Sequence, residues 1–153
     1  MTSPLPQTAI DAGFSFYGKD DGTPMFPGFE AYMGPFYYRQ HGEYYEFMTH
    51  IAPHHVNTGQ AAHGGMLAAL TDIVCSASYW NYLGRELDSG FVTVNLSHEY
   101  ISGAPADSWL LMRCQIRQAG GSMIFVDCEM SVEGKLVGLS RCVLKKVKPR
   151  QNT

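Results

Sequence analysis

The chain has 153 residues, the length of a single domain built around one hydrophobic core. Its formal net charge of -3 at pH 7 gives no general attraction to nucleic acid or to an anionic membrane, so we expect neither as a partner. Hydrophobic residues make up 45% of the chain and charged residues 16%, a balance that favours contacts between copies in a homo-oligomer.

The N-terminal region is irregular in composition, because its prolines and the stretch KDDGTPMFPG interrupt any periodic pattern. We predict that residues 1–28 form an arm that covers the core, 29–148 the folded domain and 149–153 a tail. The first residues, MTSPLPQTAI, lack the basic and apolar regions of a secretion signal, and no later run is apolar enough to span a bilayer. We therefore expect a cytoplasmic protein.

From Gly34 onward most of the chain is typical of strands. PFYYRQ and EYYEFMTHI flank His41 and Gly42 and predict a hairpin. Three further segments alternate with period two: FVTVNLSHEY, SWLLMRCQIR and SMIFVDCEMSV. In the first of them the alternation groups one set of side chains on one face: Val92, Val94, Leu96, His98 and Tyr100. KLVGLSRCVLKKVK is the last predicted strand, which frays into a basic tail.

Residues 63–82, HGGMLAALTDIVCSASYWNY, predict the one long helix, and its almost continuous apolar composition indicates burial on every side. Two strands, one helix and four strands in that order predict an α+β fold in which an antiparallel sheet wraps around the helix. The four cysteines are far apart, without a C-x-x-C pair, and are expected to be reduced thiols in the core: Cys75, Cys114, Cys128 and Cys142.

The helix carries a carboxylate, Asp72, near its middle. A buried charge without a partner would cost several kcal/mol there, a free energy comparable to the stability of a whole domain. Gly64 and Gly65 stand at the helix start, where free backbone N–H groups can polarise a carbonyl and glycine lets a ligand approach closely. Gly64 and Asp72 are roughly 12 Å apart along the helix axis. If both act on one carbonyl, the site must be shared between two subunits related by a two-fold axis.

A resemblance is carried by Asn57, by the run His63-Gly64-Gly65 with Asp72 after six intervening residues, and by the strand FVTVNLSHEY. From about Phe29 to Lys146 the chain resembles the hotdog-fold acyl-CoA thioesterases of the phenylacetate-degradation (4-hydroxybenzoyl-CoA thioesterase-like) type. The resemblance implies a sheet around a central helix, a dimer or dimer of dimers, and hydrolysis of an acyl-CoA thioester to a free acid and coenzyme A. It implies no metal and no cofactor beyond the coenzyme A of the substrate.

The resemblance also implies roles for single residues. Asp72 matches the catalytic carboxylate, as general base or nucleophile, and Gly64 the residue whose N–H polarises the carbonyl. Asn57 matches the side chain that holds water or substrate from the other subunit, and His63 the histidine beside Gly64. Thr93 matches a hydroxyl residue that orients the water. For four of them a structural reading stays open: a carboxylate satisfied by a Ser or Thr neighbour at a dimer seam for Asp72, a turn residue for Asn57, a loop contact for His63 and a strand position for Thr93.

The aromatic residues Tyr79 and Trp80 are candidates for the floor of an acyl pocket, with ordinary core packing as the alternative. Lys145 and Lys146 are candidates for the phosphates of the coenzyme, with a solvated tail as the alternative. His50, His54 and His55 do not complete a metal set, because Pro53 breaks their spacing and no cysteine or acidic partner follows. The sequence predicts a thioesterase, and a non-catalytic acyl-CoA-binding protein of the same fold is the rival hypothesis.

Overall fold

The computed structural model describes residues 4–25, 28–85 and 90–148. Its helices are α1 (Gln7–Asp11), α2 (Phe29–Met33) and α3 (Gly64–Tyr82), with a 3-10 turn at Pro53–His55. Its strands are β1 (Ser15–Phe16), β2 (Tyr37–His41), β3 (Tyr44–His50), β4 (Gly90–Tyr100), β5 (Trp109–Gln118), β6 (Met123–Val132) and β7 (Lys135–Val147).

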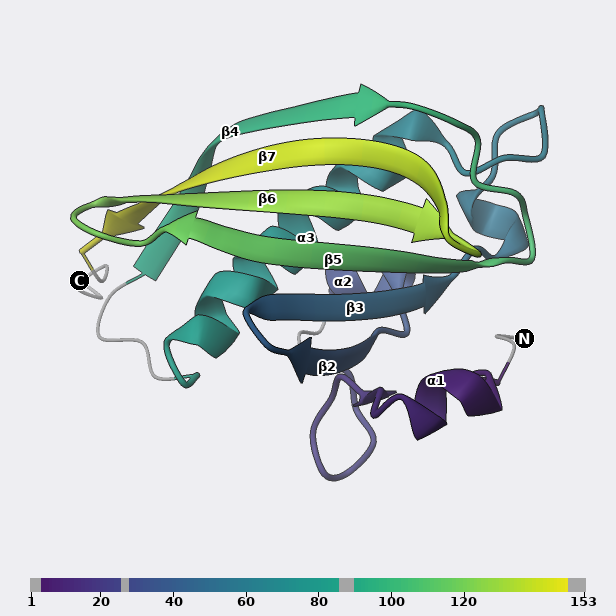
Figure 1. Ribbon diagram of the computed structural model, residues 1–153, viewed down its shortest axis with the longest axis horizontal. Helices are drawn as coiled ribbons and strands as arrows, with labels where there is room; N and C mark the ends of the chain where they lie inside the picture. The colour runs from purple at the N-terminus through teal and green to yellow at the C-terminus, as the bar shows by residue number, and fades with distance from the viewer. Residues whose placement is uncertain (1–3, 26–27, 86–89, 149–153) are drawn as a thin grey trace.

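The strands form one antiparallel sheet in the order β1-β2-β3-β5-β6-β7-β4. Figure 1 shows this sheet curved around α3, with β4 along the upper edge and the short β2 near the lower one. The predicted hairpin is confirmed: His41 pairs with Tyr44, so the turn consists of Gly42 and Glu43. The α+β prediction, with a sheet wrapped around one long helix, is also confirmed.

The core lies between the inner face of the sheet and α3. The alternation predicted for β5 and β6 is confirmed, because every second side chain is buried there: Leu110, Met112, Cys114, Ile124, Val126, Cys128, Met130 and Val132. From the other side, α3 contributes Leu70 and Val74, both with no exposed surface. Burial of each large aliphatic side chain stabilises the fold by about 1.5 to 3 kcal/mol relative to exposure.

The chain turns away two residues after the end of α3, at a glycine in the left-handed conformation. Gly84 has a φ of 66°, which suits a residue without Cβ. Its N–H donates to the carbonyl of Asn81, and the N–H of Arg85 donates to the carbonyl of Trp80. This pair of bonds satisfies two carbonyls that the last helical turn leaves open.

One side of α3 remains partly exposed, which corrects the prediction of burial on every side. Gly65 is exposed and four residues on the same side are half-buried: Ala68, Ala69, Asp72 and Ser76. Apolar composition says that a helix needs cover, but the sheet of one chain covers only the side that faces it. The uncovered side carries Asp72 and small residues.

β4 contains an irregularity that corrects the strict alternation predicted for it. Thr93 pairs with Leu144 and Asn95 pairs with Val143, so Val94 has no partner on β7. Since directly opposed residues point to the same face of a sheet, this bulge places Thr93 on the helix side together with Leu96, His98 and Tyr100. Bulges of this kind re-aim side chains, and they occur often beside active sites.

The two ends of the domain also differ in detail from the expectation. β7 continues to Val147, so Lys145 and Lys146 belong to a paired strand rather than to a fraying tail. The predicted tail, residues 149–153, lies outside the described residues. At the other end, β1 pairs with β2 and Tyr17 is part of the core. Within the described ranges, no helix is both long and apolar enough to cross a membrane.

Candidate active site

Asp72 and Thr93 meet at the contact between α3 and β4. The hydroxyl of Thr93 donates a hydrogen bond of 2.6 Å to Oδ1 of Asp72. This short, charge-assisted bond orients the carboxylate and leaves Oδ2 without a partner among the described residues. Asp72 lies on the uncovered side of α3, so its second oxygen can accept a proton from a water or a ligand.

Gly64 is the first residue of α3 and carries an N–H that no described acceptor satisfies. The carbonyl of the preceding residue, His63, is occupied by the N–H of Leu67 at 3.1 Å. An unsatisfied N–H at a helix start, supported by the helix dipole, is suited to hold a carbonyl oxygen or an oxyanion.

His63 caps the helix. Its Nδ1 accepts the N–H of Gly65 at 3.0 Å, and its own N–H donates to the carbonyl of His55 at 2.8 Å. Nδ1 of the imidazole is therefore occupied by the backbone of the first helical turn. The same bond uses the N–H of Gly65, which is then not available to a ligand. The histidine fixes the geometry of the adjacent Gly64 without an observed contact to Asp72.

Asn57 shapes the loop before the helix. Its Oδ1 accepts the N–H of Gly59 at 2.8 Å and that of Ala61 at 3.4 Å. Such side-chain-to-backbone bonds are typical of a turn residue. The side chain is exposed, and its amide nitrogen has no partner in the described part of the chain.

The structure therefore places the two chemical groups at different points of the α3–β4 contact. The Asp72–Thr93 pair lies two turns into the helix, whereas Gly64 lies at its start, beside Tyr100 at the end of β4. Sequence reasoning assigned no role to Tyr100, whose hydroxyl donates to the carbonyl of Gly64. The period-two pattern predicted its face, but not this contact with the helix start.

The four predicted substrate-binding side chains lie toward the opposite end of the α3–β4 contact from Gly64. Tyr79 is 2% exposed, and its ring packs 5.3 Å from that of Phe91, measured between centroids. Trp80 is half-buried under the guanidinium of Arg85. Lys145 is exposed, and Lys146 lies opposite Phe91 on β7.

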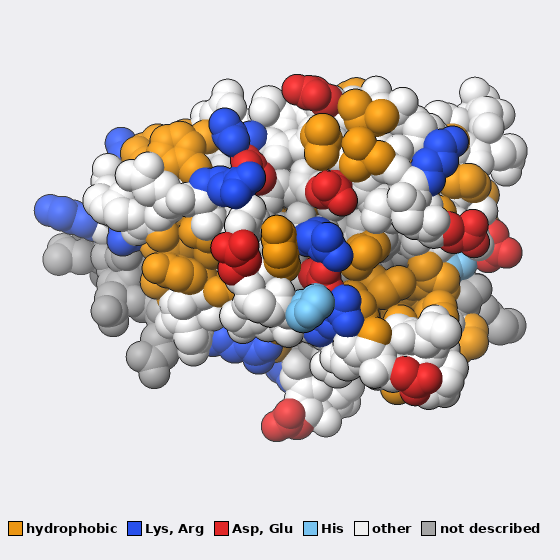
Figure 2. All heavy atoms as spheres, viewed as in Figure 1, with side chains coloured by type: hydrophobic (Ala, Val, Ile, Leu, Met, Phe, Trp, Pro, Cys, Tyr) orange, Lys and Arg blue, Asp and Glu red, His pale blue; other side chains and the backbone are white. Residues whose placement is uncertain are grey.

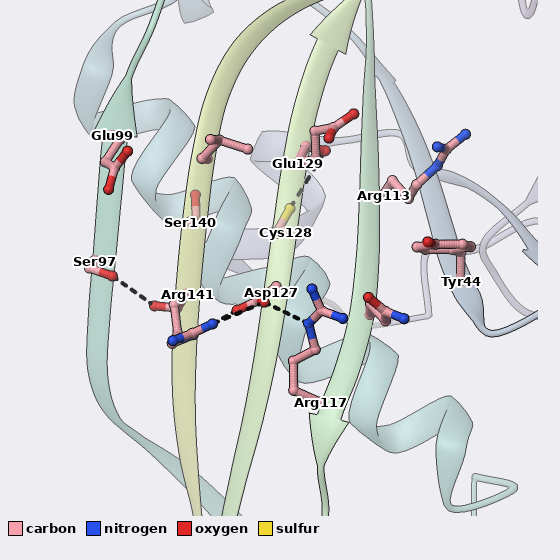
Figure 3. Close-up of a pocket in the computed structure, with 12 residues that line it drawn as sticks. Tyr44, Ser97, Glu99, Arg113, Arg117, Asp127, Cys128, Glu129, Ser140 and Arg141 are labelled. Atoms are coloured by element: carbon pink, nitrogen blue, oxygen red, sulfur yellow. Dashed lines mark hydrogen bonds and ion pairs between the residues drawn. The ribbon is translucent and has the colours of Figure 1, made fainter.

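The outer face of the sheet is hollowed as well. Figure 2 shows basic and acidic side chains interspersed over this face. A groove of about 490 Å³ crosses it, and Figure 3 shows Asp127 in its floor between Arg117 and Arg141, with bonds of 2.7 Å to each. Both arginines are paired with that one carboxylate, and neither Asp72 nor Gly64 lines the groove, so we do not assign the chemistry to it.

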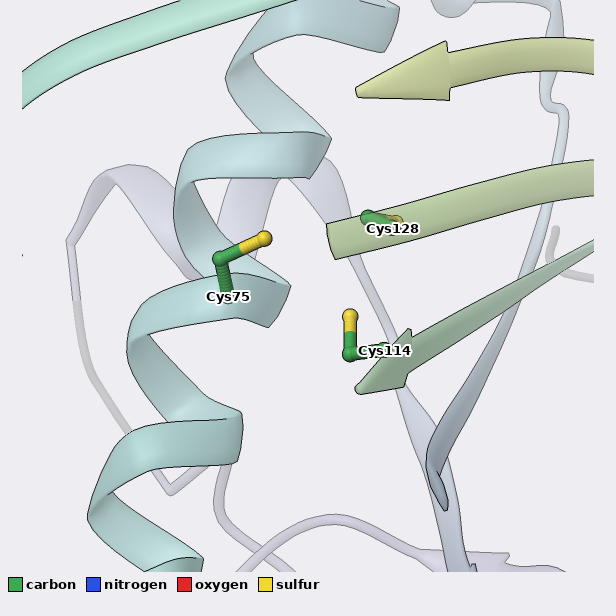
Figure 4. Close-up of side chains that lie close together, drawn as sticks. All are labelled: Cys75, Cys114 and Cys128. Atoms are coloured by element: carbon green, nitrogen blue, oxygen red, sulfur yellow. The ribbon is translucent and has the colours of Figure 1, made fainter. Parts of the chain in front are cut away.

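The cysteines gather in the core, as Figure 4 shows for three of them. The sulfurs of Cys75, Cys114 and Cys128 lie within 4.8 Å of one another, and all four cysteines are buried and free, which confirms the expectation of core thiols. Hydrogen bonding to Cys114 and to other thiols, together with burial, raises the pKa of Cys75 well above its usual value.

The three histidines weighed as a metal set, His50, His54 and His55, contact backbone and one carboxylate. His54 and His55 both approach the carbonyl of Tyr32, at 3.3 and 3.4 Å from Nε2. His50 pairs with Asp107 at 3.0 Å. Burial lowers the pKa of His55, which keeps the ring neutral near pH 7.

Comparisons with known proteins agree with this architecture. The chain is 29% identical over 106 residues to the Pseudomonas aeruginosa protein named "Putative esterase PA0474". The matched residues cover 69% of this chain and 78% of that protein. Three solved structures are similar in fold. The PaaI protein of the Escherichia coli phenylacetic acid degradation operon has a TM-score of 0.61 at 19% identity, over 69% of this chain and 73% of that one.

Zebrafish thioesterase superfamily member 2 has a TM-score of 0.69 at 22% identity, over 80% of this chain and 88% of that one. A hypothetical thioesterase of Streptococcus pneumoniae, solved with coenzyme A, has a TM-score of 0.65 at 18% identity, over 76% of this chain and 91% of that one. These similarities establish the hotdog fold. Residues 59–138, more than half of the chain, match the sequence model of the family described as the thioesterase superfamily. The chain therefore belongs to the thioesterase superfamily.

Proposed function

We propose that the protein is an acyl-CoA thioesterase, which hydrolyses an acyl- or aryl-CoA thioester to a free acid and coenzyme A. The observation that carries the proposal is the 2.6 Å bond from Thr93 to Asp72 on the uncovered side of α3. It leaves the other carboxylate oxygen, Oδ2, without a partner among the described residues. The solved relative with coenzyme A bound supports the choice of substrate class.

Asp72 acts as general base or as nucleophile. In the first route its Oδ2 takes a proton from water while the water oxygen attacks the thioester carbonyl, and the resulting oxyanion accepts the N–H of Gly64. Collapse of the tetrahedral intermediate breaks the C–S bond and releases the coenzyme thiolate, which the proton on Asp72 neutralises. A thiolate is a good leaving group, so one carboxylate and one N–H donor suffice.

The complete site consists of residues from two copies of the chain. Asp72 and Gly64 of one copy are roughly 12 Å apart along the helix, too far to share one carbonyl. β4 is an edge strand with exposed Val92 and Val94, at 47% and 49%, and the adjacent side of α3 is uncovered. Two-fold pairing along this edge would bring the Asp72 of one copy to the Gly64 of the other.

The remaining assignments are part of the same proposal. Asn57 and His63 support the water and the helix start, and Gly65 gives the ligand close access. Tyr79 and Trp80 line the acyl side, and Lys145 and Lys146 meet the coenzyme phosphates. The reaction uses no metal and no cofactor other than the coenzyme A of the substrate.

The first test is free-thiol release from short, medium, long and aryl acyl-CoAs, with a substrate-free blank because of the four cysteines. Asp72→Asn should abolish turnover while the fold and the oligomer persist, and the exposed Asp20→Asn serves as the matched carboxylate control. Hydrolysis by Asp72→Asn at the wild-type rate would refute the proposal. Binding of acyl-CoA without turnover by the wild type would favour the binding-protein alternative.

A second test removes the N–H of Gly64 alone. Proline is tolerated at the first helical position, and His63 has the extended conformation (φ -64°, ψ 135°) that proline requires before it. Gly64→Pro should therefore keep the helix but lower kcat by roughly 10²- to 10³-fold, the usual loss for one oxyanion donor. Gly64→Ala, which adds the same Cβ but keeps the N–H, controls for the contact of that Cβ with Tyr100, and its loss in kcat should be clearly smaller than that of Gly64→Pro.

Mixing the two inactive variants tests whether the site is shared. A hybrid of Asp72→Asn and Gly64→Pro subunits contains one site with both functional groups intact. Random mixing should restore about a quarter of the wild-type rate, since half of the dimers are hybrids with one intact site of two. No recovery, despite demonstrated subunit exchange, would show that each site lies within one chain.

A further inference from the structure

The first peptide of α3 is in close contact with a tyrosine from β4. The hydroxyl of Tyr100 donates to the carbonyl of Gly64 at 3.0 Å. The tyrosine ring also lies against the glycine: a Cβ at position 64 would be 3.2 Å from Cε1 of Tyr100, closer than most carbon contacts in proteins. The absence of a side chain at position 64 therefore makes room for the tyrosine ring as well as for a ligand.

The peptide group between Gly64 and Gly65 is held at both of its polar atoms. Tyr100 binds its carbonyl, and Nδ1 of His63 accepts its N–H. Two successive glycines have more backbone freedom than any other pair, and a helix start has few internal bonds to restrain them. The two side chains supply that restraint, so the adjacent Gly64 N–H has a defined direction.

Tyr100 is in turn packed against a buried polar cluster. Its ring centroid is 4.4 Å from that of His98, whose Nδ1 lies 2.7 Å from Oγ of Ser140 and 3.1 Å from Oγ1 of Thr71. Ser140 is on β7 and Thr71 on α3, next to Asp72 in the chain. The cluster thus joins β4, β7 and α3 between the positions of Gly64 and Asp72 in one chain.

The hydrogen bonds of this cluster favour one tautomer of His98. The hydroxyl of Thr71 donates to the carbonyl of Leu67 at 3.1 Å, so its oxygen remains as an acceptor. On this assignment Nδ1–H is the donor, and Nε2 is a buried acceptor with no partner in the described part of the chain. Gly138 provides the space, because a Cβ there would be 2.7 Å from Nε2. The packing holds the imidazole, and through it the tyrosine ring.

We propose that Tyr100 is a positioning residue for the Gly64 N–H, with His98 holding its ring in place. The inference rests on the proposed thioesterase function and extends it to a residue with no described contact to Asp72. A donor that is already oriented needs no reorganisation when the oxyanion forms, so loosening it raises the barrier without weakening substrate binding.

The test compares Tyr100→Phe, which keeps the ring and removes the hydroxyl, with Tyr32→Phe, an exposed control whose hydroxyl has no described partner. Two kinds of measurement are made on the full-length protein. The first gives kcat and KM for acyl-CoA hydrolysis, and the second gives the NMR order parameters of the Gly64 and Gly65 amides. We expect kcat to fall about 3- to 10-fold at nearly constant KM. The two order parameters should fall from about 0.85 to below about 0.7.

Each outcome decides a different point. Unchanged order parameters in Tyr100→Phe would overturn the restraint, whatever the activity does. Lower order parameters with unchanged kcat, or a loss confined to KM, would overturn the positioning role. Absence of hydrolysis by the wild type would instead refute the proposed function, and the order parameters would still decide whether Tyr100 restrains the helix start.

Discussion

Single residues on the outer face of the sheet show how differently two ion-pair clusters are built. Glu46 has no exposed surface, and its two oxygens bind Arg39 at 2.5 Å and Arg113 at 2.7 Å. Asp127 is 25% exposed between Arg117 and Arg141, and both arginines are more than half exposed. The buried carboxylate depends on its partners because water cannot replace them.

This contrast predicts different costs for the same chemical change. Glu46→Gln should lower the free energy of unfolding by about 2 to 3 kcal/mol, because it removes the charge from a buried group with two cationic partners. Asp127→Asn should cost less than about 1 kcal/mol, since solvent screens that cluster. Urea denaturation of both variants measures the difference, and equal losses would contradict this account.

At the scale of elements, the contact between α3 and β4 contains a histidine that is sensitive to pH. Burial lowers the pKa of His98 below its ordinary value of 6.5. The unfolded chain therefore binds more protons than the folded chain as the pH falls below that value. The stability contributed by the neutral ring is complete above pH 6.5 and is lost as the pH drops toward the lowered pKa.

The expected result is a decrease in unfolding free energy for the wild type as the pH falls from about 7 to 5. His98→Asn, which can still bond to Thr71 and Ser140, should show a shallower decrease. Some slope should remain, because burial also lowers the pKa of His55. Urea midpoints measured across this range test the prediction, and an identical slope in the variant would assign the effect to other groups.

The same contact shows why strand patterns predicted its residues only in part. Period two grouped Leu96, His98 and Tyr100 correctly on one face, but it placed Thr93 on the other. The bulge at Val94 reverses the alternation, and no residue in FVTVNLSHEY marks its position. The resemblance assigned Thr93 a role, and the bulge explains how a strand residue out of phase with its neighbours reaches Asp72.

At the scale of the whole molecule, the exposed edge predicts an assembly on which activity depends. A lysine on an edge strand opposes pairing with another strand because its charge would be buried. Val94→Lys should therefore yield monomers and abolish hydrolysis, although Asp72 and Gly64 remain. Leu139→Lys is the matched control. Leu139 is 39% exposed and lies on β7, which is paired with a strand on each side, so this variant should keep the dimer.

Light scattering coupled to gel filtration, with activity measured on the same fractions, tests this prediction. A monomeric Val94→Lys protein with full activity would contradict the shared site. An active dimer would instead show that β4 is not the pairing edge.

The sequence by itself determined the α+β class, the long helix and the inward faces of β5 and β6, because these depend on local periodicity. It marked Asp72 as a candidate because a lone carboxylate in an apolar helix is costly. Tertiary structure decided how the groups are used. His63 and Asn57 bond to backbone because the loop folds back on itself, and Tyr100 meets Gly64 because a strand 36 residues later crosses the helix start. Such contacts join residues distant in the chain, and local pattern carries no information about them.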